Sequence, residues 1–299
     1  METRLVTAFY FENNEGVPSH PFHLHNVIAR YHRYLYSIVQ LSKMNLPIRL
    51  VCGDNVYDAL TKELQSNNIK NVEVEVRDLS SFKYSKKIGE LKNKYPGKFD
   101  FYHEIDWAKL DLLKEESKKD ADYLYWIDCG LSHRGLWPNK YAENPKELTG
   151  FSHNIENYKF DKIFTPDFFK HINNWVGDKL INIKNKQHFH QSYDINKFMG
   201  DISCCNGQSI GGILGGHNTK IKSFLNEFDK RAQQCIDQEF VLNHEGILTH
   251  MAESKPEDYK SWLFTTWYHE NTGGMDWITP EWLSTQTSFY HFLKEIGHE

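Results

Sequence analysis

The chain has 299 residues, enough for one large domain or two closely fused ones with a sizeable core. Hydrophobic residues make up 39% and charged residues 25%, which is typical of a soluble globular protein. The net charge of −5 argues against a nucleic-acid-binding protein, because such proteins usually carry a basic excess.

The five cysteines indicate a reducing compartment. They are odd in number, no CxxC pair is present, and the adjacent Cys204 and Cys205 are poor disulfide partners for each other. The start of the chain has no apolar run behind a basic segment, so no signal peptide is visible. No stretch approaches the roughly 18 apolar residues of a membrane span. We therefore expect a cytoplasmic protein, which could work at the inner face of the membrane.

The first half of the chain alternates strand-like and helix-like patterns. Strand-like runs occupy residues 5–11, 48–52, 72–76 and 123–127. Apolar residues recur at helical spacing in residues 27–41, 56–65 and 105–113. The Lys-rich residues 83–98 indicate a solvated loop or helix face. This βαβα order favours a mainly parallel, doubly wound α/β sheet flanked by helices.

The second half is less regular at first. Residues 135–200 are rich in Asn, His and aromatic residues, and we expect them to form short helices at best and to fold over the active edge of the sheet. A strand is expected near residues 209–214, followed by a helix with an apolar stripe from Ile221 to Cys235 and a β-prone run at 262–268. No internal repeat or linker divides the chain, so we predict a single compact domain.

The strongest chemical signal is the segment Tyr-Leu-Tyr-Trp-Ile-Asp-Cys-Gly that ends at Gly130. Its acidic residue, Asp128, would end a buried strand at the carboxyl edge of the sheet, where open α/β folds bind ligands. A carboxylate there can hold a divalent cation against a diphosphate or accept a hydrogen bond from a sugar hydroxyl. Gly130 would let the backbone come close to such a ligand. The alternative is an Asp that only caps a turn.

Two further segments could contribute to a site. In Gly-Gly-Ile-Leu-Gly-Gly, Gly211 and Gly212 begin a run that could turn backbone amides towards an oxygen-rich ligand, although close packing of a strand on a helix explains it equally well. Asp237 and Glu239 follow the apolar stripe of the helix, and one of them could be a general base for an acceptor hydroxyl. A solvated helix end is the alternative.

The sixteen histidines raise the question of a metal site. None of them forms HExxH or a Cys/His zinc pattern, so we expect most to be surface or interface residues. His269 differs because it follows a β-prone run near the end of the sequence.

Taken in order, these segments resemble the GT-A glycosyltransferases, and more narrowly the bacterial HtrL/YibB-type family of surface-polysaccharide gene sets. The matching parts cover about residues 5–245. They are Val-Thr-Ala-Phe-Tyr at 6–10, Ala-Lys-Leu-Asp-Leu-Leu at 108–113, Tyr-Trp-Ile-Asp-Cys-Gly at 125–130, the glycine segment and Asp-Gln-Glu at 237–239.

The resemblance implies a role for each segment. A nucleotide-sugar donor would lie across residues 1–134, and the acceptor, a glycan or lipid-linked glycan, would meet residues 135–299. The donor-binding residues implied are Ala8, Phe9, Tyr10, Lys109, Asp128, Gly130, Gly211 and Gly212, and Asp237 or Glu239 would approach the acceptor.

One departure from the family pattern concerns the metal. The usual acidic motif is Asp-any-Asp, whereas this chain has Asp128-Cys129-Gly130, so the second carboxylate is missing. Either Mn²⁺ or Mg²⁺ is held by the donor phosphates with sparse protein ligation from Asp128 and His269, or a basic side chain such as Lys109 or Arg134 neutralises the diphosphate without a metal.

The sequence thus predicts a transferase that moves a sugar from a nucleotide sugar to a glycan hydroxyl, in polysaccharide biosynthesis. Two other classes remain open at this point. A metal-dependent hydrolase could use the histidine-rich loops at residues 20–25 and 188–190. A non-catalytic carbohydrate-binding protein could use the aromatic residues, which make up 14% of the chain.

Overall fold

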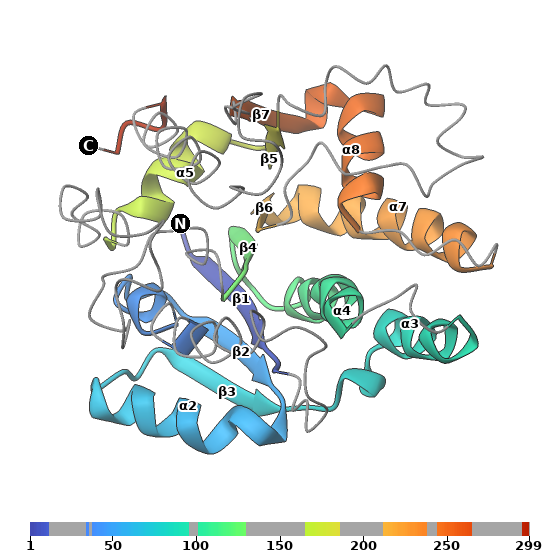
Figure 1. Ribbon diagram of the computed structural model, residues 1–299. Helices are drawn as coiled ribbons and strands as arrows, with labels where there is room; N and C mark the ends of the chain where they lie inside the picture. Colours follow the sequence, from blue (N-terminus) through green and yellow to red (C-terminus); the bar gives the residue numbers. More distant parts are fainter. Residues whose placement is uncertain are drawn as a thin grey trace, which may run out of the picture.

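A computed structural model gives the arrangement of the chain in space (Figure 1). The structure describes residues 1–11, 34–35, 38–95, 101–129, 165–185, 212–237, 244–264 and 295–298.

A seven-stranded sheet forms the centre of the molecule, in the order β3-β2-β1-β4-β6-β5-β7. Every neighbouring pair is parallel except the two that involve β6, which runs antiparallel to both β4 and β5. This confirms the predicted mainly parallel α/β sheet. The strands are β1 (Thr3–Phe9), β2 (Ile48–Cys52), β3 (Val72–Val76), β4 (Tyr123–Ile127), β5 (Leu180–Asn185), β6 (Ile213–His217) and β7 (Tyr259–Phe264).

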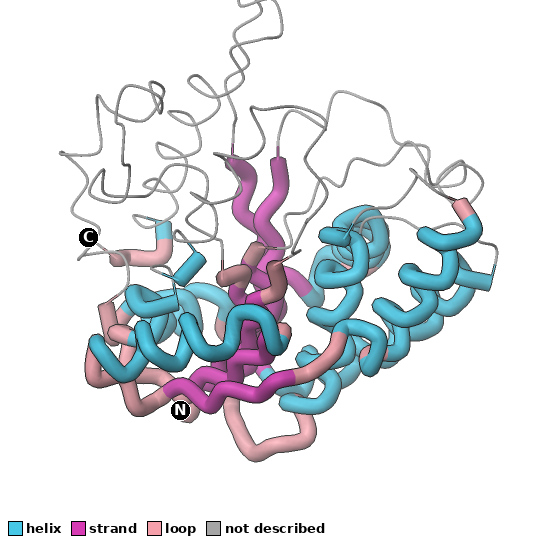
Figure 2. The backbone as a smooth tube through the Cα atoms, turned by 60° about the horizontal axis from the view of Figure 1, so that its bottom comes forward, coloured by secondary structure: helices cyan, strands magenta, loops and turns pink. Residues whose placement is uncertain are grey.

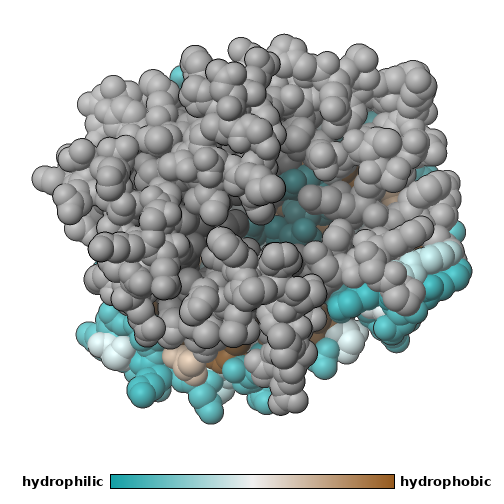
Figure 3. Space-filling view, in the orientation of Figure 1, coloured by the Kyte–Doolittle hydropathy of each residue, from teal (hydrophilic) through white to brown (hydrophobic). Residues whose placement is uncertain are grey.

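Helices cover both faces of this sheet, so the molecule has three layers (Figures 1 and 2). The residues that face outward on α2 and α3 are mainly hydrophilic (Figure 3), as expected for amphipathic helices at a surface. The helices are α2 (Asp54–Ser66), α3 (Lys83–Lys94), α4 (Phe101–Glu116), α5 (Phe168–Val176), α7 (Asn218–Asp237) and α8 (His244–Ser254).

The alternation of side chains along β1 supplies both layers of the core. Leu5 and Phe9 point to the face that packs on α5 and α2. Val6 and Ala8 point to the opposite face, in the large cluster that contains Trp107 of α4. Because a strand buried on both faces needs apolar residues at every position, β4 reads Tyr-Leu-Tyr-Trp-Ile, and all five of its residues are buried.

The glycine pair at 215–216 lies inside β6, whereas the strand predicted from the sequence ended at residue 214. Gly215 and Gly216 have φ values of +153° and +147°, which residues with a side chain rarely adopt. A Cβ atom on Gly215 would lie 2.2 Å from the backbone oxygen of Leu124, and one on Gly216 would lie 2.2 Å from that of Lys179. The glycines therefore let β6 approach β4 and β5 closely, which is a structural role.

Three elements of the second half, β5, β6 and α8, differ from the sequence prediction. The interval 135–200 contains a strand of the main sheet, β5, as well as the helix α5. The strand expected at 209–214 is β6, shifted to Ile213–His217, and α8 was not predicted at all. Within the described part of the chain, no helix combines the length and the apolar character needed to cross a bilayer.

Candidate functional site

The candidate site lies at the carboxyl edge of β1 and β4. These two parallel strands are neighbours, with Val6 of β1 opposite Trp126 of β4. From β1 the chain continues to its neighbour β2 on one side, and from β4 it continues to β5 on the other side, beyond β6, so the strand order reverses between β1 and β4. Ligands of open α/β sheets bind in the crevice that such a reversal creates. Ala8 comes two residues after Val6, and Asp128 comes two residues after Trp126. Both residues therefore lie at the carboxyl edge of the sheet, as predicted.

Asp128 is held in a defined orientation by two donors to the same oxygen. Its Oδ1 atom accepts a hydrogen bond of 2.6 Å from the indole Nε1 of Trp126 and lies 3.0 Å from Nζ of Lys109. Its backbone amide donates to the oxygen of Gly212 at 2.8 Å. No described residue donates to Oδ2, and 31% of the side chain is exposed. Among the described residues, this second carboxylate oxygen is therefore the one that could bind a ligand.

Lys109 joins this strand end to helix α4. Its amine is almost fully buried and lies 3.1 Å from Asp106, one helical turn earlier, as well as 3.0 Å from Asp128. The ammonium also stands over the ring of Trp126, 5.6 Å from its centroid. Each of these contacts favours the charged lysine, so a buried cation is stable here.

Asp106 connects the same cluster to the start of α8. Its Oδ2 atom lies 3.7 Å from Nδ1 of His244, the first residue of that helix, and the His244 ring is buried. The order His244, Asp106, Lys109, Asp128 thus runs from α8 across α4 to the end of β4.

The electrostatics of the cluster are dominated by acidic groups. Burial by itself would lower the pKa of Lys109, but the carboxylates of Asp106 and Asp128, with a smaller effect from Glu245, raise it above its ordinary value. Lys109 is therefore charged at neutral pH and is in contact with two carboxylates, those of Asp106 and Asp128. Counted over these three described residues, the charge is negative, which favours binding of a further cation.

The predicted residues at the end of β1 are placed differently from one another. The Tyr10 hydroxyl donates to the backbone oxygen of Arg77 at 3.0 Å, beyond the end of β3, and burial raises the tyrosine pKa, so the hydroxyl stays protonated. Ala8 is buried on the face of α4. The Phe9 side chain is fully buried on the opposite face, beside Cys129, so only its backbone reaches the cleft.

Of the predicted residues on the second half, Gly212 and Asp237 can be described. Gly212 borders the site through its hydrogen bond to Asp128. Asp237 is the last residue of α7; it is exposed and accepts a hydrogen bond of 2.7 Å from Gln233, and no contact within the described ranges joins it to Asp128. Four predicted positions lie outside the described residues, namely Gly130, Gly211, Glu239 and His269.

The described residues offer a partial metal site. They contain no cluster of three or more His, Cys, Asp or Glu that could enclose an ion. One fitting ligand is present, the open Oδ2 atom of Asp128, since carboxylate oxygen suits Mg²⁺ and Mn²⁺.

Sequence reasoning missed two members of the site. Asp106 could have been found from its position, because residues three apart on a helix share a face and Asp106 precedes Lys109 by three. His244 had no such signal, since it comes close to Asp106 only through the packing of α8 on the rest of the fold.

The sequence matches no family model, and no curated protein is similar to it in sequence. Among solved structures, the chain is similar to the apo form of mouse xyloside xylosyltransferase 1, with a TM-score of 0.42 and 10% identity over 88% of this chain and 85% of that one. It is also similar to a "putative nucleotide-diphospho-sugar transferase" from Desulfovibrio desulfuricans G20, with a TM-score of 0.40 and 7% identity over 99% of both chains. What the site can do follows from its own residues.

Proposed function

We propose that this protein is a glycosyltransferase of the GT-A type that uses a nucleotide-sugar donor. The observation that carries the proposal is the pair formed by Asp128 and Lys109 at the reversal point of the sheet, where one carboxylate oxygen is fixed and the other is open. The buried ammonium of Lys109 orients Asp128 at an edge where ligands bind. Asp128 could then recognise a phosphate-bearing ligand through a metal ion that bridges the two.

The role of Lys109 in this proposal is to position Asp128. The lysine holds Oδ1 at 3.0 Å, and the indole of Trp126 holds the same oxygen at 2.6 Å, so neither of these contacts uses Oδ2. A group whose orientation is fixed in advance needs no reorganisation when charge develops on the substrate, which is how electrostatic catalysis gains its strength.

The excess of acidic groups favours a divalent cation with the donor. In sugar transfer the leaving group is a nucleoside diphosphate, and negative charge grows on it in the transition state. Asp106 and Asp128 would repel that group if Lys109 were its only partner. Mn²⁺ or Mg²⁺ bound to Asp128 Oδ2 and to the donor phosphates would supply the positive charge. His269 remains the proposed second ligand.

The acceptor side completes the proposal. Residues 1–134 would form the donor half and residues 135–299 the acceptor half, with Asp237 or Glu239 as the base that takes the proton of the acceptor hydroxyl. The acceptor would be a glycan or a lipid-linked glycan of a surface polysaccharide, met in the cytoplasm or at the inner face of the membrane. Membership of the HtrL/YibB-like family is part of the same proposal.

A binding experiment tests the donor site first. We expect UDP-, GDP-, CMP- or dTDP-linked compounds with Mn²⁺ to raise the melting temperature, since a ligand at 100 times its Kd stabilises by about 2.7 kcal/mol. Asp128→Asn should abolish the shift produced by the active compound. Asp120→Asn is the matched control, because Asp120 is an exposed acid before β4 and should leave the shift intact.

Transfer activity tests the chemistry. Asp128→Asn should lower turnover by about 10²-fold or more, the size expected for losing one strong electrostatic contact. Chelation with EDTA should abolish transfer and added Mn²⁺ should restore it; full activity in EDTA would exclude the metal. No response to any nucleotide would contradict the proposal. Stabilisation by zinc alone would then favour the hydrolase, and stabilisation by glycans alone the carbohydrate-binding protein.

A further inference from the structure

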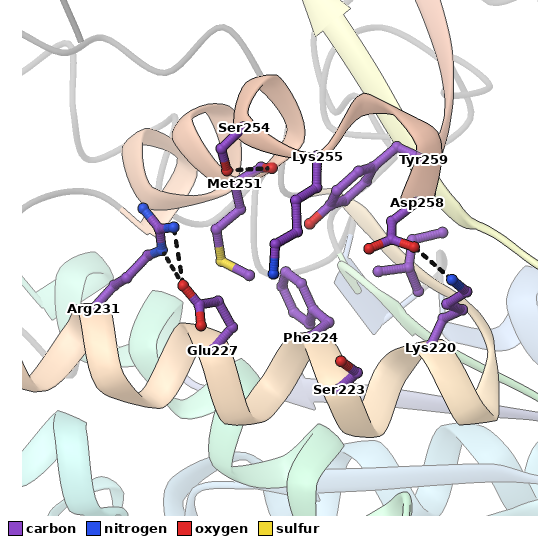
Figure 4. Close-up of a pocket in the computed structure, with 11 residues that line it drawn as sticks. Lys220, Ser223, Phe224, Glu227, Arg231, Met251, Ser254, Lys255, Asp258 and Tyr259 are labelled. Atoms are coloured by element: carbon purple, nitrogen blue, oxygen red, sulfur yellow. Dashed lines mark hydrogen bonds and ion pairs between the residues drawn. The ribbon is translucent and has the colours of Figure 1, made fainter.

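A cavity lies away from the candidate site, between helix α7 and the segment that runs from the end of α8 into β7 (Figure 4). Its volume is about 130 Å³, close to the roughly 150 Å³ at which a cavity admits one benzene ring. One wall is a single face of α7, because its lining residues on that helix follow helical spacing from Lys220 to Arg231.

Five charged residues line this cavity, and four of them form two ion pairs with each other. Lys220 pairs with Asp258 at 2.5 Å, and Arg231 pairs with Glu227 at 2.9 Å. The fifth charged residue, Lys255, forms no ion pair with any residue in the described ranges, and its amine points into the cavity (Figure 4). The cavity therefore carries a net charge of about +1, and Lys255 is available to bind an anion.

Tyr259 provides a second donor at the same place. The residue is only 9% exposed, and its hydroxyl points into the cavity (Figure 4). Within the described chain, this hydroxyl has no hydrogen-bond partner. Burial raises the tyrosine pKa, so the hydroxyl keeps its proton at neutral pH and can donate it. The hydroxyl is therefore available to donate to a ligand in the cavity.

The rest of the lining suits a ring with hydroxyl groups. Phe224, Met251 and Leu180 are buried and give the cavity an apolar side. Ser223 and Ser254 add hydroxyls, and the Ser254 hydroxyl already donates to the backbone of Met251, so its oxygen is left as an acceptor. An apolar surface with hydroxyl partners around it is what a sugar ring requires, because its C–H face is apolar and its rim is polar.

We propose that this cavity binds a sugar acid, a six-membered sugar ring with one carboxylate. The carboxylate would be held by the Lys255 ammonium and the Tyr259 hydroxyl, and the ring would lie against Phe224. A sugar acid fits better than a phosphate dianion, because Glu227 and Asp258 also border the cavity. These carboxylates would repel a second negative charge but can accept hydrogen bonds from sugar hydroxyls.

The position of the cavity relative to the candidate site follows from α8. His244 at the start of this helix lies beside Asp106, and Ser254 at its end lines the cavity. Ten residues of α-helix rise about 15 Å, so the two sites are separate. The proposal does not depend on the transferase proposal, since binding of a sugar acid can be measured without any donor.

The experiment compares ligands that differ in one group. Methyl glucuronide and methyl glucoside share the ring, and only the first has the carboxylate; their binding to the full chain is measured by ligand-observed NMR titration. We expect the glucuronide to bind at least about tenfold more tightly. Lys255→Met and Tyr259→Phe should each weaken glucuronide binding by about tenfold, because hydrogen bonds to a charged group are strong. Lys255 is exposed, so its variant should fold normally.

Lys222→Met is the matched control, because Lys222 is an exposed lysine of α7 that does not line the cavity. It should bind glucuronide like the natural chain. Equal binding of the two sugars, or unchanged affinity in Lys255→Met, would overturn the proposal, and so would inorganic phosphate that competes as well as the glucuronide. The titration is then repeated with an oligosaccharide that ends in glucuronate. If the oligosaccharide binds more tightly than methyl glucuronide, the ligand is a glycan; if it binds more weakly, the ligand is a free sugar acid.

Discussion

Replacing Lys109 by methionine removes the buried cation of the candidate site while keeping most of its aliphatic length. Asp106 and Asp128 both lie within 3.1 Å of the lysine nitrogen, so without it two carboxylates stand at most about 6 Å apart. At an effective dielectric constant of 20, two unit charges at that distance repel by about 3 kcal/mol. Both carboxylates are about 30% exposed, which weakens the repulsion, and we expect the variant to lose about 2 kcal/mol of unfolding free energy.

Urea unfolding followed by tryptophan fluorescence measures this loss at pH 7, first in low salt and again in about 1 M NaCl. The raised pKa of Lys109 means that its stabilising charge is fully present below its ordinary pKa, so the natural lysine is charged at pH 7. The loss should shrink at the higher salt concentration, because salt screens the repulsion between the two partly exposed carboxylates. Lys114→Met on the same helix is the control and should cost less than about 1 kcal/mol, because Lys114 is 45% exposed and lies 3.6 Å from its partner, Asp229. An equal loss at both salt concentrations would refute the electrostatic account and assign Lys109 a packing role.

Glu116→Gln should cost about 3 kcal/mol in urea unfolding, because Glu116 is fully buried and lies 2.8 Å from Arg4, which would keep only the more distant and exposed carboxylate of Glu2; an unchanged midpoint would contradict this. Gly215→Ala should abolish soluble expression, since its Cβ would lie 2.2 Å from the oxygen of Leu124, and a normally folded variant would show that β6 can shift. Burial raises the pKa of Cys52 to about 11, so about one Cys52 thiol in a thousand is ionised at pH 8. Alkylation followed by mass spectrometry should therefore label Cys52 only after unfolding, and rapid labelling of Cys52 in the folded chain would refute this expectation.

The parts of the fold that the sequence predicted are those whose pattern is local. The strands at 48–52, 72–76 and 123–127 have the predicted bounds, because each is a short apolar or alternating run between turns. Helix α8 was missed because most of its residues are buried, including His244 and Gly246, so it has no polar face to mark its period. Strand β5 was missed because its partners, β6 and β7, come much later in the chain.

In the candidate site, too, the sequence predicted the residues that have a local pattern and missed the contacts that depend on packing. Asp128 was found because it ends an apolar strand, and Lys109 entered through the family resemblance on its helix. Their direct contact of 3.0 Å and the extension of the cluster to His244 depend on how α4 and α8 pack, which no local pattern encodes. The sequence left two roles open for the glycine segment, because a glycine needed for close approach of two backbones looks the same in sequence as one that lines a ligand site; for Gly215 and Gly216 the structure shows close approach between strands.

The late position of β6 in the sequence has a consequence for the synthesis of the chain. The four strands β1 to β4 are complete once residue 127 has left the ribosome, but β4 then exposes an apolar edge until β6 pairs with it about 85 residues later. At 5–20 residues per second, this interval lasts about 4 to 17 s. An open apolar strand edge is a template for aggregation. We therefore expect a fragment that ends near residue 134 to aggregate, and the nascent chain to depend on chaperones until the sheet is closed on both sides of β4.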